Sequence, residues 1–350
     1  MNETVRIGVL GASGYTGADL VRLASGHKHV EVRLLTASSH AGKPMSEVFP
    51  HLSFSDLPDL VTIDDADWSS VDAVFCGLPH GTTQGIASRI LSDHSDLRFI
   101  DMSADFRLTD PAVYEEWYGH PHLALDLQNE AVYGLTEHNR DRIRDARIVA
   151  CPGCYPTAVL LALIPAIAAA SIDAHEIIID AKSGVTGAGR GLKQKSLFPE
   201  AGEGLSPYAI GTHRHSAEIE QELGRAAGGA IIVNFTPHLV PMSRGELCTI
   251  YVRLTDNKTA DDLRALLADA YRAEPFVHVT AAGVVPQTQN VRGSNHVQIG
   301  VFADRVPGRA IIVSTLDNLV KGSAGQAVQN FNLMFGMSET EGLRQLPLFP

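Results

Sequence analysis

The feature that most constrains the fold is a glycine-rich turn between the first apolar segment and the first helical pattern. Val5–Leu10 is apolar and rich in β-branched residues, whereas Ala18–Ser25 has the apolar spacing of a helix. Between them lies the segment Gly11-Ala12-Ser13-Gly14-Tyr15-Thr16-Gly17. Glycines in a strand-to-helix turn let backbone N–H groups close on a pyrophosphate at the helix N-terminus. The spacing G-x-x-G-x-x-G, placed after the first strand, therefore predicts a nucleotide-binding α/β domain.

The loop after the next predicted strand bears on the choice of nucleotide. Val30–Ala37 leads into Ser38 and a loop that carries Lys43 but no acidic residue. NAD enzymes usually place Asp or Glu here to bind the ribose hydroxyls. Hydroxyls and a lysine suit instead the extra phosphate of NADP, although an ordinary polar loop would have the same composition. Two further buried strands are predicted for this half, at Val71–Cys76 and Leu97–Met102.

Two arginines follow predicted strands and are candidate anion contacts. Arg107 comes shortly after Leu97–Met102, and an arginine at such a point can hold a carboxylate or phosphate with two hydrogen bonds. Arg190 lies in a glycine-rich basic loop after the predicted strand Glu176–Ala181. A surface salt bridge for the first arginine and a solvated loop for the second explain the sequence as well.

Cys154 is the candidate nucleophile. It follows a short predicted strand and a tight turn, and it opens an apolar helix that runs to Ala170. A helix N-terminus favours an anion and lowers the pKa of a thiol. A lone cysteine is more often a small buried residue, and Cys-x-x-Cys pairs also occur in dithiol and zinc sites. Zinc needs about four ligands, and Cys76 and Cys248 stand alone in strand-like segments, so no metal site is predicted.

A histidine cluster stands at the entrance of a later predicted helix, in the segment Gly211-Thr212-His213-Arg214-His215-Ser216-Ala217-Glu218. His215 and Glu218 are one helical turn apart, so that Glu218 either caps the helix or orients the imidazole. A single histidine is usually structural. Two histidines with an arginine at a helix entrance favour a catalytic base or a phosphate binder.

The rest of the second half predicts an α+β domain. Its apolar segments predict strands that form a mostly antiparallel sheet covered by helices. A long helix with small residues is predicted to begin at Asp317 and to pack on the nucleotide domain. The predicted strands are Ile231–Phe235, Cys248–Leu254, Val297–Ala303 and Ala310–Leu316.

Length and charge limit the classes of function. The chain has 350 residues, enough for about two domains, and its formal net charge of −12 argues against nucleic acid or an anionic membrane as a main partner. The longest apolar run, Ala158 to Ala170, contains Pro165 and is shorter than the ~18–20 residues of a spanning helix. The four cysteines have no disulfide pattern, and the chain opens with a strand. A cytoplasmic globular protein is predicted.

Taken in order, these motifs resemble the N-acetyl-γ-glutamyl-phosphate reductase family, which is of the aspartate-semialdehyde dehydrogenase type. The resemblance covers nearly the whole chain. It rests on eight segments: Gly11–Gly17, Ser103–Leu108, Tyr133–Glu137, Pro152–Thr157, Ser183–Gly191, His213–Glu218, Pro237–Pro241 and Asp317–Asn330.

The resemblance implies a fold, an activity and an assembly. An α/β Rossmann-type NADP-binding domain would comprise residues 1–150 and be completed by the C-terminal helix at 318–350. Residues 151–317 would form a central α+β domain for catalysis and for assembly into a homo-oligomer, a dimer or tetramer. The implied reaction is the NADPH-dependent reduction of N-acetyl-γ-glutamyl phosphate to N-acetylglutamate 5-semialdehyde in arginine biosynthesis, with release of inorganic phosphate.

The resemblance also implies roles for individual residues. Cys154 would form a thioester with the substrate, and His215 would be the acid/base, with Glu218 beside it. Three residues would contact the substrate: Arg107, Arg190 and His213. NADP would be held by Gly11, Ser13, Gly14, Tyr15, Thr16, Gly17 and Ser38, with Asn318, Gln326 and Asn330 on the nicotinamide side.

One position departs from the family pattern. Residue 151 is often Asn in relatives and is Cys151 here. The spacing leads to the hypothesis that Cys151 forms a reversible disulfide with Cys154 that switches the enzyme off. A merely packed Cys151 explains the sequence equally well. Peroxide inactivation that dithiothreitol reverses, with an intramolecular disulfide seen by mass spectrometry, would separate the two.

Two rival functions remain at the level of the sequence. A sibling reductase would act on aspartyl phosphate or on a carrier-bound aminoadipyl phosphate. A catalytically inactive NADP sensor would need neither a nucleophile nor a base, so the presence of both Cys154 and His215 counts against it.

Overall fold

Two units make up the computed structural model, which describes residues 4–255 and 257–350. The first unit comprises Met1–Pro152 and Ser323–Arg344, and the second comprises Gly153–Gly322 and Gln345–Pro350. The sequence placed the division at residues 150 and 317. The two compact units divide at 152 and 322, with residues 345–350 in the second, and the predicted domain boundaries stay a prediction.

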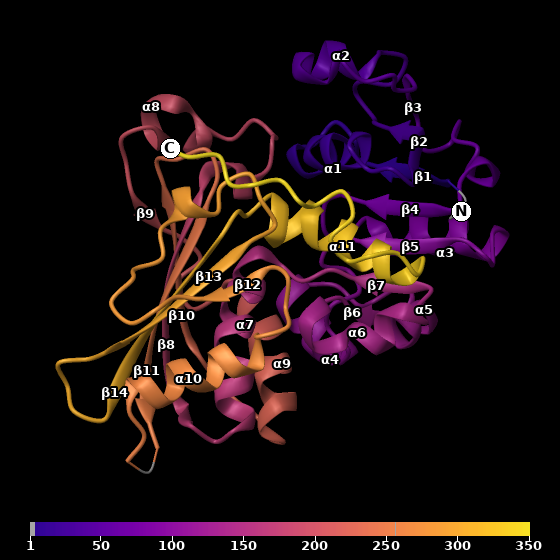
Figure 1. Cartoon of the computed structure of the whole chain (residues 1–350). Coiled ribbons are helices and arrows are strands. Elements are labelled where there is room, and N and C mark those ends of the chain that lie inside the picture. Colours follow the sequence, from indigo (N-terminus) through magenta and orange to yellow (C-terminus); the bar gives the residue numbers. More distant parts are fainter. Residues whose placement is uncertain (1–3, 256) are drawn as a thin grey trace. The chain divides into compact units, whose positions relative to one another are not determined.

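A parallel sheet forms the centre of the first unit, as the Rossmann-type prediction required. Its strand order is β3-β2-β1-β4-β5-β7-β6, and every neighbouring pair is parallel (Figure 1). The order changes direction beside β1, so the crevice that binds ligands in such sheets lies at the carboxyl ends of β1 and β4. The strands are β1 (Val5–Leu10), β2 (Val30–Thr36), β3 (Leu60–Val61), β4 (Ala73–Cys76), β5 (Arg98–Asp101), β6 (Val132–Tyr133) and β7 (Ile148–Ala150).

The helices of the first unit include one from the end of the chain. Helix α11 contacts α1, α6 and β5, and the Phe331 ring lies 5.4 Å from that of Phe75 on β4. The chain reaches α11 through a π-helical turn, Val320–Ala324. The helices are α1 (Tyr15–Ser25), α2 (Met45–Val48), α3 (Thr83–Asp93), α4 (Pro111–Tyr118), α5 (Leu125–Glu130), α6 (Thr136–Arg144) and α11 (Gly325–Met334).

A mixed sheet forms the second unit, in the order β12-β13-β14-β11-β8-β10-β9. Only β8–β10 and β12–β13 are parallel pairs, so the prediction of a mostly antiparallel sheet is confirmed. The strands are β8 (Ile172–Gly184), β9 (Ser206–Pro207), β10 (Asn234–Val240), β11 (Glu246–Leu254), β12 (Val277–Val279), β13 (Val297–Ala303) and β14 (Arg309–Leu316).

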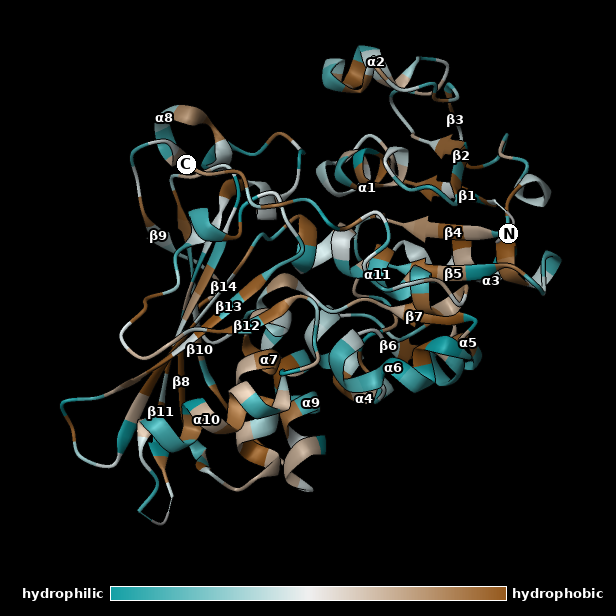
Figure 2. Ribbon diagram, in the orientation of Figure 1, coloured by the Kyte–Doolittle hydropathy of each residue, from teal (hydrophilic) through white to brown (hydrophobic). Residues whose placement is uncertain are grey.

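Helices cover one face of this sheet. α7 (Cys154–Ala168) packs on β8, β11 and β14, and it also contacts α9 (His215–Ala227) and α10 (Ala260–Ala270). Figure 2 shows that α7 is mostly apolar, whereas α6 of the first unit is mostly polar. The buried residues of β11 alternate along the strand and face the helices. Among the described residues, no helix combines the length and the apolar character that a membrane crossing requires.

The strand predicted at Ile231–Phe235 is misplaced. The observed β10 begins at Asn234 and continues through Pro237 to Val240. A proline inside a strand removes a ladder hydrogen bond and normally argues against a strand. β10 lies between β8 and β9. Its neighbour β9 has only two residues, so the missing N–H of Pro237 has little cost. Ile231 and Val233 are still buried, but they precede the strand.

Candidate active site

The glycine turn is wound tightly over the start of α1. Gly11 has a left-handed φ of +76°, and a Cβ added at Gly17 would lie only 2.6 Å from the Gly11 carbonyl oxygen. Gly14 is the N-cap of α1 and offers no side chain to cap it. The first N–H groups of the helix therefore suit an anion, and a side chain at Gly17 would disrupt the turn. The other predicted cofactor residues of this turn, Ser13, Tyr15 and Thr16, are partly exposed.

The end of β2 lies beside this turn. Thr36 is buried and accepts the Gly11 N–H through Oγ1 at 3.3 Å, so it holds the turn in place. Ser38 and Lys43 are both exposed in the loop that follows. Exposed hydroxyl and ammonium groups next to a glycine turn fit the adenosine side of a dinucleotide. The residues present therefore suit the cofactor that the sequence implies.

Gln326 on α11 has one polar atom in use and one without a partner. Its Nε2 donates to the Gly134 carbonyl oxygen at 2.7 Å, and its Oε1 is buried with no hydrogen bond among the described residues. Asn330, one turn later, donates to the same carbonyl at 2.8 Å. An unpartnered buried acceptor is unfavourable unless a ligand supplies a donor. Gln326 thus fits the predicted contact with the carboxamide end of a nicotinamide.

Arg107 is less available than the sequence suggested. Its guanidinium is buried, with Nε 2.7 Å from the Cys151 carbonyl oxygen and Nη2 3.1 Å from that of Met102. These bonds tie β5 to the segment that leads out of β7. Arg107 therefore supports the backbone, and its role as a substrate contact stays a prediction.

Cys154 is the first residue of α7, with Gly153 as the N-cap. The Gly153 N–H donates to Oε1 of Glu218 at 2.9 Å, and Glu218 is buried on α9. Glu218 had been predicted to cap its own helix or to orient His215. Its carboxylate also holds the turn before Cys154, and both predicted roles stay predictions.

The environment of the Cys154 thiol corrects the expectation of a lowered pKa. Burial raises the pKa well above the usual value, and the carboxyl group of Glu246 raises it further. The Tyr155 backbone N–H at the start of α7 does lower it, as the helix N-terminus predicts. Desolvation outweighs this contribution, although the Cys154 side chain is only partly buried. In the free protein Cys154 is therefore a thiol.

His213 and His215 lie together at the start of α9. Their ring centroids are 4.7 Å apart, and each ring is edge-on to that of Tyr155, at 5.9 Å. The His213 Nδ1 accepts the His215 backbone N–H at 3.1 Å, and burial lowers the pKa of His213 to about 4. His213 is therefore neutral near pH 7 and fixes the turn that carries His215. Since Tyr155 follows Cys154, both predicted catalytic residues border one aromatic cluster.

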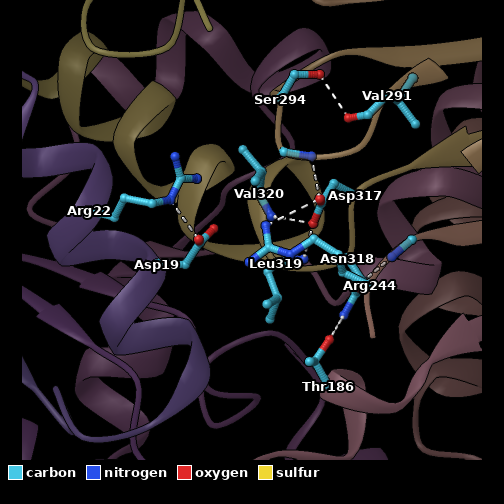
Figure 3. Close-up of polar contacts among 12 residues, drawn as sticks. Asp19, Arg22, Thr186, Arg244, Val291, Ser294, Asp317, Asn318, Leu319 and Val320 are labelled. Atoms are coloured by element: carbon cyan, nitrogen blue, oxygen red, sulfur yellow. Dashed lines mark hydrogen bonds and ion pairs between the residues drawn. The ribbon is translucent and has the colours of Figure 1, made fainter. Parts of the chain in front are cut away.

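Asn318 and Arg190 have different surroundings within the second unit. Asn318 is buried; its Oδ1 accepts the Gly245 N–H at 2.8 Å and its Nδ2 donates to Thr186 Oγ1 at 3.0 Å (Figure 3). It thereby joins the loop after β8 to the turn before β11. Arg190, further along that loop, is exposed. Their predicted contacts with cofactor and substrate stay predictions.

Two buried carboxyl groups, those of Asp317 and Glu246, were not predicted as site residues from the sequence. Asp317 accepts the backbone N–H groups of Gly293 at 2.6 Å and of Leu319 at 2.9 Å, and pairs with Arg244 (Figure 3). Glu246 lies in the core beside Cys154. The available signal for Glu246 was its position directly before an apolar segment, but the predicted strand began only at Cys248.

Comparison with known proteins identifies the family. The model of the semialdehyde dehydrogenase NAD-binding domain matches residues 6–146, and that of the dimerisation domain matches residues 154–318. The chain is 57% identical to the N-acetyl-γ-glutamyl-phosphate reductase of Rhodospirillum rubrum over the whole of both proteins. It is 55% identical to the probable chloroplastic enzyme of Arabidopsis thaliana, over 99% of this chain and 86% of that protein.

The chain belongs to the N-acetyl-γ-glutamyl-phosphate reductase family. As a member, it is an oxidoreductase that uses a nicotinamide cofactor and has an oligomer-forming second unit. Solved structures agree on the fold. Aspartate semialdehyde dehydrogenase II from Vibrio cholerae matches with a TM-score of 0.72 at 18% identity, covering 95% of this chain and 98% of that one. Aspartate semialdehyde dehydrogenase from Candida albicans, solved with NADP, matches with a TM-score of 0.64 at 17% identity, covering 95% of this chain and 98% of that one.

Close packing around Cys154 leads to a first prediction for this family member. A Cβ added at Gly322 would lie 2.7 Å from the Cys154 Cβ. Gly322→Ala is expected to displace the nucleophile and to lower kcat by about 10²-fold, because a misplacement of 1 Å has effects of that size. Steady-state kinetics would measure it. Gly85→Ala is a matched helical control, since nothing lies within 4 Å of that position. An unchanged kcat in Gly322→Ala would show that Cys154 tolerates the shift.

Proposed function

We propose that the chain catalyses the NADPH-dependent reduction of N-acetyl-γ-glutamyl phosphate to N-acetylglutamate 5-semialdehyde, through a thioester on Cys154, in arginine biosynthesis. One observation carries the proposal. Cys154 opens α7 after a turn that Glu218 holds, and His215 opens the helix to which Glu218 belongs. A nucleophile and a base on two packed helix N-termini suit acyl transfer.

The first half-reaction forms the thioester. The Cys154 Sγ forms a bond to the acyl carbon, and the proton of the thiol passes to His215. The bond from the acyl carbon to the phosphate oxygen breaks, and its electron pair leaves with inorganic phosphate. Backbone N–H groups at the N-terminus of α7 can stabilise the negative charge on the acyl oxygen. Covalent capture on Cys154 divides one difficult reduction into two easier steps.

In the second half-reaction the acyl group is reduced and released. When bound, the reduced nicotinamide supplies a hydride to the thioester carbon. His215 then stabilises the oxyanion, and the carbon–sulfur bond breaks to leave the aldehyde and the Cys154 thiolate, which takes up a proton. His213 keeps its imidazole neutral throughout and holds the turn.

The reverse reaction is the direct test. Purified protein should reduce NADP with N-acetylglutamate 5-semialdehyde only when phosphate is present. Aspartate semialdehyde serves as the control substrate for the sibling activity. A higher kcat/KM with aspartate semialdehyde would overturn the substrate assignment, and phosphate-independent turnover would overturn the acyl-phosphate chemistry.

We propose NADP rather than NAD as the cofactor, and this gives the second prediction. Ser38 and Lys43 are exposed beside the glycine turn, and residues 36–43 contain no acid. A charge-assisted contact with the 2′-phosphate contributes roughly 1.5–3 kcal/mol, so kcat/KM for NADPH should exceed that for NADH by about tenfold or more. Ser38→Asp should reduce or reverse the preference by repelling the phosphate. Equal kcat/KM values for the two cofactors in the native protein would refute the proposal.

We further propose that the protein acts as a dimer or tetramer through the uncovered face of the second sheet. Ile178 on β8 is 44% exposed there although it lies in the middle of a strand. Sedimentation of the native protein and of Ile178→Asp would measure the assembly. A reducing compartment such as the cytoplasm suits a mechanism that depends on a reduced Cys154 thiol, and no cysteine of the described residues forms a disulfide.

A further inference from the structure

Glu246 is a buried carboxyl group that the proposed mechanism leaves unused. It is the first residue of β11 and has no exposed surface. Its side chain is on the inward face of β11, together with the buried Cys248 and Ile250. Among the described residues no nitrogen or oxygen donor pairs with either carboxyl oxygen, and the Cys154 thiol is the one side chain that interacts with the carboxyl group as a hydrogen-bond partner. An isolated buried carboxylate is unfavourable, and such groups in native proteins call for an explanation.

The position of Glu246 in the fold puts it next to the proposed nucleophile. Glu246 is paired with Leu316 in the ladder between β11 and β14. A Cβ placed on Gly322 would lie 3.2 Å from the Leu316 Cδ1 and 2.7 Å from the Cys154 Cβ. Leu316 is thus a neighbour of both residues. Helix α7, which begins at Cys154, packs on β11 and β14.

The charges around Glu246 make its ionisation difficult. The pKa of Glu246 is raised to about 8, chiefly by burial; a hydrogen bond with the Cys154 thiol lowers it, and the Asp317 carboxylate adds to the rise. Arg244 is paired with Asp317. Among the described residues, Glu246 also shifts the pKa values of Tyr155, Tyr208 and Cys248, all three neutral when protonated; the cation Lys182 acts on Cys248. No cation is among these described partners of Glu246, so a second negative charge on Cys154 would meet that of Glu246 directly.

We propose that Glu246 is a positioning residue that controls the nucleophile: Cys154 can become a thiolate only while the Glu246 carboxyl group holds its own proton. The inference rests on the proposed role of Cys154 as the nucleophile. Two adjacent anions, one on the fully buried Glu246 and one on the partly buried Cys154, repel each other strongly because little solvent screens them. The protonated carboxyl group, by contrast, is neutral and can donate a hydrogen bond to the sulfur.

This coupling has a definite pH signature. Below pH ~8 Glu246 is protonated, and the fraction of Cys154 thiolate rises about tenfold per pH unit, as for any acid below its pKa. Above pH ~8 Glu246 loses its proton. Because the Cys154 thiolate forms only beside the neutral carboxyl group, the falling fraction of protonated Glu246 cancels each further gain in thiolate. Thiol reactivity in the native protein should therefore level off above pH ~8, although the pKa of the thiol itself lies well above 9.

The experiment measures alkylation of Cys154 by iodoacetamide from pH 6.5 to 9.5, with the modified peptide quantified by mass spectrometry. Glu246→Gln retains the shape of the protonated acid but cannot ionise. Its alkylation rate should equal that of the native protein at pH 6.5 and exceed it by about tenfold at pH 9. Glu222→Gln removes a buried glutamate that pairs with Arg225, and its profile should follow that of the native protein.

Superimposable native and Glu246→Gln profiles would overturn the proposal. If Glu246→Gln fails to fold, the native profile still decides, because a tenfold rise per unit through pH 9.5 would exclude the coupling. Glu246→Asp, which keeps an acid, should restore the levelling. Alkylation reports the thiol whether or not turnover depends on it. Failure of the proposed function would instead appear as turnover in a protein that lacks Cys154.

Discussion

Cys154→Ala is expected to abolish reduction of the acyl phosphate, with kcat lowered by about 10⁴–10⁶-fold, the range found when a covalent nucleophile is removed. Without Sγ no thioester forms, and the hydride would have to reach an acyl phosphate that is not held covalently. Cofactor binding should survive, because the glycine turn at Gly11–Gly17 belongs to the first unit and Cys154 to the second.

Two measurements on the purified variant check this expectation. NADPH fluorescence titration should give a dissociation constant close to that of the native protein, while turnover is lost. Cys151→Ala is the matched control, since Cys151 is also a cysteine of the same turn but is buried, with Asn330 Nδ2 3.6 Å from its sulfur. Substantial turnover in Cys154→Ala would show that Cys154 is not the nucleophile. Loss of activity in the control would assign Cys151 more than a packing role.

The first unit was largely predictable because its signals are local. The turn Gly11–Gly17 follows directly on a strand, and Gly17 is held close to Gly11 and Ala12 of the same turn, although a Cβ at Gly11 would also meet the Gly77 carbonyl oxygen at 2.9 Å. The strand before Arg107 was found because its centre is apolar and buried, whereas the strand before Ser38 alternates apolar and charged residues at its start and becomes apolar and buried at its end. The two- and three-residue edge strands, such as β3 and β12, were not found, since so few residues carry no periodicity.

The chemistry around Cys154 was predictable only in part. Its place at a helix N-terminus could be read from the chain, and so could the pair His213 and His215. The raised pKa of the thiol could not, because it depends on burial and on Glu246, which is far away in sequence. Glu218 shows the same limit: nothing in its spacing indicated that its carboxylate also accepts the N–H of Gly153. Sequence spacing identifies helical neighbours and misses partners across a packed interface.

His215→Asn is expected to lower kcat by about 10²–10⁴-fold, the usual contribution of a general acid–base. Asparagine preserves a polar side chain of similar reach but cannot carry a proton between the thiol, the solvent and the oxyanion. Alkylation of Cys154 near pH 7 should slow as well, because the group that receives the thiol proton is gone. A slower chemical step should appear equally in single-turnover and steady-state rates.

The adjacent histidine supplies the matched control for this prediction. His213 has a pKa of about 4, so it is neutral across the working range, and its Nδ1 accepts the His215 backbone N–H. Its contribution is therefore to hold the turn, and His213→Asn, whose Oδ1 can accept the same N–H, should cause a clearly smaller loss. If His213→Asn proves the more damaging change, or if Cys154 alkylation is unaffected in His215→Asn, then His215 does not receive the thiol proton. The acid–base role would then pass to His213 despite its lowered pKa.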